Sequence, residues 1–175
     1  MIPRLVVVTG PPGAGKTTIA AELKARLGLP LIAKDALKET LGEGLEFAGD
    51  RHESQRLGVA TLHVQFAVVR ELLSAGVSVI VEGNFRFAEW FETLPVARIT
   101  QLHVVAEPRT LRDRLLVRDT HRHPVHYDRE AAEEIAARAA AGEWPALPLG
   151  GRLIRIDTTV WPDLDEVLAE VWTVS

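Results

Sequence analysis

An eight-residue segment near the start of the chain constrains the fold more than any other. It reads GPPGAGKT and fits the pattern G-x-x-x-x-G-K-[ST]. Its glycines let successive N–H groups turn inward to bind phosphate. Lys16 can reach the β- and γ-phosphates of a nucleotide, and the hydroxyl of Thr17 can bind Mg²⁺. We therefore expect ATP and Mg²⁺ to bind at Gly10, Pro11, Pro12, Gly13, Ala14, Gly15, Lys16, Thr17 and Thr18.

A phosphate-binding loop of this kind joins a buried strand to a helix, and the residues on either side of it fit that order. Residues 4–9 (RLVVVT) are mostly apolar, which is typical of a strand buried on both faces. Ile19, Leu23 and Leu27 recur at four-residue intervals over 16–27, as one face of a helix does. The alternative interpretation is a Gly- and Pro-rich surface turn before an ordinary helix. That alternative leaves the strand–loop–helix order unexplained.

The rest of the chain alternates short apolar runs with helical patterns, which predicts a mainly parallel sheet with helices on both faces. Leu57, Val64, Val68 and Leu72 indicate the buried face of the longest helix. Residues 42–50 contain three glycines and are expected to form a mobile connection. We expect strands at 4–9, 31–33, 77–81, 98–106 and 152–156, and helices at 16–27, 35–41, 53–75, 86–92, 110–118, 129–141 and 163–171.

Length and composition exclude several classes of function. A chain of 175 residues is expected to form one domain, 1–175. Its net charge of −4 argues against nucleic-acid binding. No lysine follows Lys38, so the chain lacks the Asn/Thr-Lys-x-Asp motif that a GTPase needs. Without cysteine, a long charge-free apolar run or a leader, it is expected to be cytoplasmic and not bound to a membrane.

Four segments together resemble the P-loop kinases: VVVTGPPGAGKTT, LPLIAKD, VIVEGNF and RDTHRHPVH. Within this group the chain is most similar to predicted small kinases related to polynucleotide 5′-kinase, the zeta toxins and chloramphenicol phosphotransferase. The resemblance covers nearly the whole chain. It implies an α/β, three-layer P-loop fold whose five-stranded parallel sheet has the order 2-3-1-4-5. It also implies an arginine-bearing lid at about 118–128 that closes over ATP.

Two carboxylates follow predicted strands, at the edge where ligands bind in such sheets. The resemblance makes Asp35 the residue that orients or deprotonates the acceptor hydroxyl, and phosphoryl transfer needs such a positioned group. The alternative role of Asp35 is to stabilise a helix start. Glu82 stands where the family often carries aspartate. It is predicted to hold a Mg²⁺-bound water, and the alternative is a cap on the turn with Gly83.

Several other polar residues receive roles from the resemblance. Arg118 is expected to pack on the base or the β-phosphate of ATP, and Arg122 to meet the γ-phosphate, whereas the alternative is a solvated basic face. Thr158 follows the last strand and is expected to contact the adenine side through its backbone. Asn84 and Arg86 are expected to touch the acceptor or, alternatively, to begin a solvated helix. Residues 42–52, which include Arg51, are expected to border the acceptor as well.

These residues predict an ATP- and Mg²⁺-dependent kinase that phosphorylates a hydroxyl of a small molecule. Lys16, Arg122 and Mg²⁺ on Thr17 would neutralise charge on the transferred phosphoryl group, while Asp35 positions the acceptor. Alternatives of the same chemistry are a polynucleotide 5′-hydroxyl kinase and a toxin-type sugar-nucleotide kinase. Alternatives of another class are a nucleotide-binding regulatory module with little turnover and an ATPase in a larger assembly. The sequence specifies neither the acceptor nor the oligomeric state.

Overall fold

Five parallel strands form a single sheet in the computed structural model, which describes residues 2–118, 123–127 and 130–172. The order is β2-β3-β1-β4-β5, which confirms the fold class and the strand order that the resemblance implied. The strands are β1 (Arg4–Thr9), β2 (Leu31–Ala33), β3 (Val79–Glu82), β4 (Arg98–Val105) and β5 (Arg152–Asp157).

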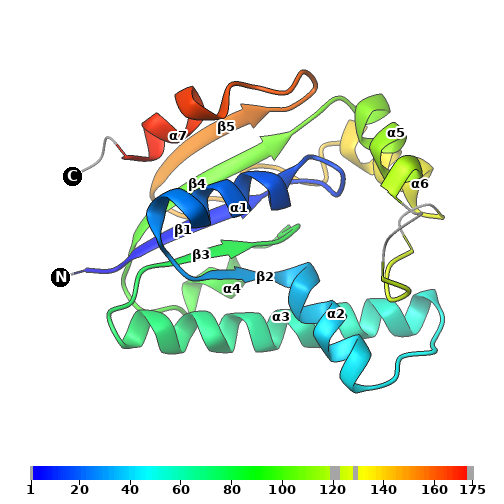
Figure 1. Cartoon of the computed structure of the whole chain (residues 1–175), viewed down its shortest axis with the longest axis horizontal. Helices are drawn as coiled ribbons and strands as arrows, with labels where there is room; N and C mark the ends of the chain where they lie inside the picture. Colours follow the sequence, from blue (N-terminus) through cyan, green and yellow to red (C-terminus); the bar gives the residue numbers. More distant parts are fainter. Residues whose placement is uncertain (1, 119–122, 128–129, 173–175) are drawn as a thin grey trace.

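Helices cover both faces of this sheet (Figure 1). They are α1 (Lys16–Leu27), α2 (Lys34–Gly44), α3 (Arg51–Ser74), α4 (Glu89–Glu92), α5 (Pro108–Arg118), α6 (Ala132–Ala140) and α7 (Leu164–Trp172). β1 is apolar along its length because both of its faces are covered. Val6 and Val8 pack in the cluster that contains α1 and α7, while Leu5 and Val7 pack in the cluster that contains α3.

The longest helix, α3, confirms only part of the predicted buried face: Leu57 is buried and Leu72 packs against the core, but the two valines between them do not. Val64 and Val68 are 40% and 37% exposed, whereas Gln65 and Val69 are fully buried. The spacing of apolar residues gave the wrong position for the middle of the buried face because a polar residue, Gln65, occupies a core position. Gln65 donates hydrogen bonds to backbone carbonyls there. By length and composition alone α3 could cross a membrane, but it packs against the sheet as a core helix.

The helix boundaries also differ from the prediction at several points. α2 extends to Gly44, into the connection that we expected to be mobile. α3 begins at Arg51, two residues early, because Asp50 accepts a hydrogen bond from the N–H of Glu53 and the Glu53 side chain accepts one from Asp50 in return. α4 begins at Glu89 and α6 at Ala132, three residues later than predicted in each case. None of these shifts moves a strand out of the predicted order.

Candidate active site

The loop of residues 10–17 joins β1 to α1 and is built around glycines in strained conformations. Gly10, Gly13 and Gly15 have φ angles of 142°, 83° and 87°, which L side chains rarely adopt. A Cβ on Gly10 would lie 1.9 Å from the carbonyl oxygen of Val104, and one on Gly13 would lie 3.0 Å from that of Leu111. The loop backbone therefore touches β4 and α5 directly, and these contacts fix its conformation.

Lys16 begins α1 and is folded back over this loop. Its Nζ donates a hydrogen bond to the carbonyl oxygen of Pro11 at 2.8 Å, and the side chain is buried. Gly15 is the N-cap, and within the described residues no side chain caps the first turn of α1. Backbone N–H groups at such a helix start attract anions. A glycine cradle, a lysine and this helix start together fit the phosphate chain of a nucleotide.

Arg114, in α5, and Thr158, directly after β5, brace the loop. Arg114 donates from Nη2 to the carbonyl oxygen of Thr158 at 2.5 Å and from Nη1 to its hydroxyl at 3.0 Å. That hydroxyl donates in turn to the carbonyl oxygen of Ala14 at 2.8 Å. The predicted contact of Thr158 with the nucleotide remains a prediction, whereas its side chain serves here to support the loop.

A cavity of about 720 Å³ opens beside the loop. Gly13, Lys16 and Thr17 line one part of it, and residues of α2, α3, α6 and the loop after β3 line the rest. Asp35 lies in the first turn of α2 and Glu82 is the last residue of β3, and both line this cavity. The structure therefore brings the two predicted carboxylates into the same space as the phosphate loop.

Gln65 holds together the strand ends that present these carboxylates. Its Nε2 donates to the carbonyl oxygens of Ile32, in β2, and Glu82, in β3, at 2.8 Å in both cases. The side chain is fully buried, so these bonds are shielded from water. Sequence reasoning missed Gln65 because glutamine on a helix is usually exposed, and no motif marks this position.

The predicted magnesium ligands suit the ion. Thr17 and Glu82 both line the cavity and offer a hydroxyl and a carboxylate. Mg²⁺ usually binds one or two protein oxygens and completes its shell with water and phosphate oxygens. No group of three His, Cys, Asp or Glu residues that could hold a metal occurs within the described ranges. The residues present thus fit a magnesium ion that arrives with a nucleotide.

The residues predicted to touch the acceptor also line the cavity. Asn84 accepts a hydrogen bond from Lys34 Nζ at 3.3 Å. Arg51, at the start of α3, and Arg86, in the loop after β3, are each paired with a glutamate within or just after α6. The structure thus gathers these three predicted residues on the wall formed by α2, α3 and the loop after β3.

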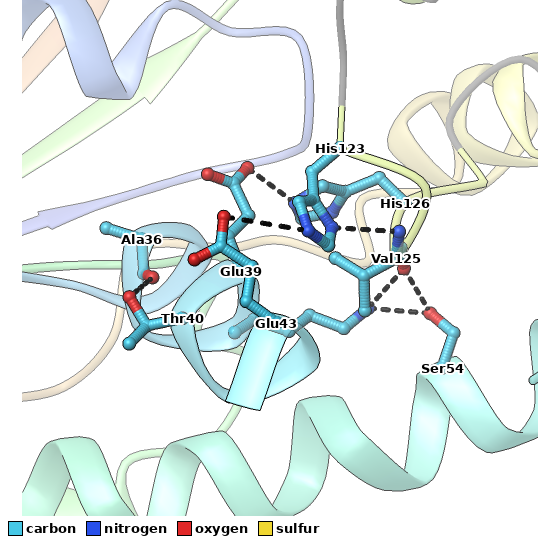
Figure 2. A network of polar contacts seen from close by, with 9 residues as sticks. Ala36, Glu39, Thr40, Glu43, Ser54, His123, Val125 and His126 are labelled. Carbon is cyan, nitrogen blue, oxygen red and sulfur yellow. Dashed lines mark hydrogen bonds and ion pairs between the residues drawn. The ribbon is translucent and has the colours of Figure 1, made fainter. Parts of the chain in front are cut away.

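Part of the predicted lid is docked on α2 and α3 (Figure 2). The carbonyl oxygen of Val125 accepts hydrogen bonds from Lys38 Nζ at 3.1 Å and from Ser54 Oγ at 2.7 Å. His126 Nε2 lies 2.9 Å from Glu39 Oε1. The segment 123–127 is therefore attached to the same two helices that border the acceptor side of the cavity.

Arg114, Arg118 and Arg122 are spaced four residues apart, and of these the structure describes the side chain of Arg114 alone. Arg118 is the last residue of α5, but its side chain and all of Arg122 lie outside the described residues. Their contacts with ATP remain predictions. Arg114 belongs to the same series, so its spacing could have signalled the brace on the loop. No sequence pattern marks Trp161 as part of the site. Its ring nevertheless lies 2.7 Å from the position that a Cβ on Gly15 would occupy.

Residues 5–141 match the AAA domain family. No curated protein matches the chain significantly. Among solved structures, a "putative kinase" from Chloroflexus aurantiacus J-10-fl is 33% identical, with a TM-score of 0.87 over 98% of this chain and 97% of that one.

Two more distant structures share the fold. A sugar kinase from Janibacter sp. HTCC2649 is 21% identical, with a TM-score of 0.64 over 98% of this chain and 93% of that one. Shikimate kinase from Bacteroides thetaiotaomicron is 17% identical, with a TM-score of 0.58 over 96% of each chain. The chain therefore belongs to the AAA domain family and is built as a small P-loop kinase.

Proposed function

We propose that this protein transfers the γ-phosphate of ATP to a hydroxyl group of a small-molecule acceptor. One observation carries the proposal: the phosphate loop, Asp35 and Glu82 line a single cavity. In-line phosphoryl transfer requires a donor phosphate, neutralising charge and a positioned hydroxyl in the same space. The kinase fold and the similarity to solved kinases support this assignment.

On the donor side, the loop and the start of α1 bind the phosphates through their N–H groups. Lys16, held at the loop by Pro11, neutralises charge on the β- and γ-phosphates. Thr17 and Glu82 would hold Mg²⁺, which when bound supplies further charge neutralisation on those phosphates. Arg114 keeps the loop in place through Thr158, so the donor site is pre-organised.

On the acceptor side, Asp35 orients the hydroxyl and accepts its proton as the oxygen–phosphorus bond forms, while the bond from the γ-phosphorus to the β–γ bridging oxygen breaks and ADP leaves. Gln65 holds the ends of β2 and β3, so Asp35, two residues after β2, stays near Glu82 at the end of β3. An aspartate in the first turn of a helix also stabilises that helix. The catalytic and the helix-stabilising roles of Asp35 can be separated by experiment. Loss of the catalytic role lowers the rate of phosphoryl transfer, whereas loss of the helix-stabilising role lowers the stability of the fold.

The size of the cavity favours a small molecule over a polynucleotide. Sites for small molecules typically enclose roughly 300–1,000 Å³, and this cavity of about 720 Å³ lies within that range. The net charge of −4 does not attract a polyanion as long as a nucleic acid. Gluconokinase from Sinorhizobium meliloti and the shikimate kinase above share the fold and are named for small hydroxyl compounds, which supports the same class of acceptor.

The test is an acceptor screen with radiolabelled ATP, followed by the Asp35→Asn variant on each acceptor found. General-base catalysis contributes roughly 10²- to 10⁴-fold, so we expect transfer to fall by that factor while calorimetry shows unchanged ATP binding. Glu71→Gln, an exposed change on α3, is the matched control. Transfer by Asp35→Asn at the wild-type rate would overturn the role of Asp35. ATP binding without transfer to any acceptor would favour a regulatory module.

A further inference from the structure

Five charged side chains form a continuous series of ion pairs along the part of the cavity that α3, α6 and the loop after β3 enclose. Arg51 pairs with Glu134. Arg138 Nη1 lies 3.2 Å from Glu134 Oε1, and Arg138 Nη2 lies 2.8 Å from Glu143 Oε2. Arg86 Nη1 lies 3.0 Å from the same oxygen of Glu143. We call these five residues the Arg–Glu chain. It alternates in sign and has an arginine at each end.

The Arg–Glu chain carries a net positive charge at neutral pH. A hydrogen bond from Arg51 lowers the pKa of Glu134, and one from Arg138 lowers the pKa of Glu143. Both carboxylates are therefore ionised, and so are the guanidinium groups. Three cations against two anions leave one positive charge in excess.

The cavity as a whole also has an excess of positively charged side chains, whereas the full protein has an excess of negatively charged ones. Among its lining residues are six Lys and Arg side chains and three Asp and Glu side chains. The full chain has 20 basic and 24 acidic residues. Lys34 and Lys38 extend the positive wall along α2, next to Asp35. A local excess of cations in an acidic protein favours an anionic ligand.

Arg51 and Arg86, at the two ends of the Arg–Glu chain, have N–H donors that can bind an anion. A guanidinium carries five N–H donors. The bonds described above occupy Nη2 of Arg51 and Nη1 of Arg86. Both side chains are close to 40% exposed, at 40% and 39%. An oxyanion in the cavity can therefore bind either arginine without displacing its glutamate.

The same cavity has an apolar wall. Val59 and Phe87 line it and are 54% and 56% exposed, so their apolar surface faces the open space. Gly58 lies beside them on α3. A Cβ there would lie 3.8 Å from Lys34 Nζ and 3.9 Å from Lys38 Cε, which is ordinary contact. Packing does not require a glycine, so its effect is to widen the cavity.

We propose that the acceptor is a small organic anion: a hydroxyl compound with an apolar body and a carboxylate or phosphate group. Its anionic group binds Arg51 or Arg86, at one end of the Arg–Glu chain. Its apolar body lies against Val59 and Phe87, and its hydroxyl reaches Asp35. This inference rests on the proposed function, because it names the acceptor class of the same site.

The experiment compares acids with neutral analogues that keep the same hydroxyl. The pairs are 3-phenyllactate with 3-phenyllactamide, shikimate with methyl shikimate, and gluconate with gluconamide. Transfer from radiolabelled ATP is measured together with direct binding by calorimetry. We expect the acid of at least one pair to bind and react at least tenfold better than its neutral analogue. Equal or stronger binding of the neutral members in every pair would overturn the inference, whether or not transfer occurs.

Variants then locate the anion site. Hydrogen bonds to charged groups are worth roughly 10- to 100-fold in affinity, so Arg51→Gln or Arg86→Gln, whichever removes the arginine that holds the anion, should raise KM and Kd for the acid by that factor. KM for ATP and kcat should stay unchanged, and Arg51→Lys should retain most of the preference. Arg56→Gln is the matched control, exposed on the same helix and outside the cavity lining. If neither Arg51→Gln nor Arg86→Gln has a larger effect on KM and Kd for the acid than Arg56→Gln, the site is refuted.

A failure of the proposed function looks different. In that case ATP binds and the acid binds, but no phosphate is transferred to any compound. The anion preference then stands on the calorimetric data alone, while the kinase assignment is lost.

Discussion

Replacing Gly10 with alanine should destabilise the protein far more than the same change at Gly76. Both glycines have positive φ, 142° and 75°, so both variants carry a backbone strain of about 1–3 kcal/mol. Only Gly10 has a steric conflict as well. A Cβ on Gly76 meets nothing within 4 Å, whereas one on Gly10 would lie 1.9 Å from the backbone oxygen of Val104. The comparison therefore separates the contact with β4 from the strain.

The size of the extra cost follows from what must move. Real Cβ contacts essentially never fall below 3.0 Å, so β4 and β1 must part by at least about 1 Å next to the pair Thr9–His103. Losing one or two ladder hydrogen bonds costs about 0.5–1.5 kcal/mol each. We expect a total loss of about 1.5–6 kcal/mol for Gly10→Ala, and only the strain of about 1–3 kcal/mol for Gly76→Ala.

Urea unfolding at 25 °C measures both losses, and calorimetry with ATP follows the function. Gly10→Ala should also weaken nucleotide binding, because the shift occurs at the first residue of the phosphate loop. Gly76→Ala should leave it unchanged. If the two variants lose the same stability, β4 does not support the loop and the reasoning fails.

Two further predictions concern pH and the docked lid segment. Burial lowers the pKa of His103, so its contribution to stability is complete above about pH 6.5 and is lost as the pH falls below that value. The melting temperature should therefore drop between pH 7.5 and pH 5.5, and less so in His103→Gln; an equal drop in both proteins would contradict this. Ser54→Ala removes a donor to Val125, worth about 1 kcal/mol. The amides of 125–127 should then exchange about fivefold faster, as hydrogen-exchange mass spectrometry can show, whereas no change relative to exposed Ser74→Ala would argue against docking through Ser54.

The phosphate loop and the strands were predictable because their signals are local in sequence, whereas the strand order followed from the resemblance to the P-loop kinases. A glycine-rich loop between an apolar strand and a helix lies within residues 4–27, and each later strand is a short apolar run. The positions of Asp35 and Glu82 followed from a general rule, because residues after parallel strands meet at one edge of the sheet. The structure places both beside the loop, as this rule predicts.

The acceptor side was harder to predict because its contacts join distant parts of the chain. Arg51 and Glu134 are 83 positions apart, and Arg86 and Glu143 are 57 apart. No periodicity or motif couples such positions, so Arg51 was expected near the acceptor but not its partner on α6. Buried Gln65 was missed for a related reason: its role appears only once β2 and β3 lie side by side.

The brace on the phosphate loop has a consequence for synthesis of the protein. Ribosomes make the loop well before Arg114 and Thr158, which hold it: Thr158 is 144 positions after Ala14. A nascent polypeptide that has not emerged beyond β5 would carry the complete nucleotide motif without its support. We therefore expect ATP to bind firmly only after β5 has emerged, so ATP binding would distinguish chains that include β5 from chains truncated before it.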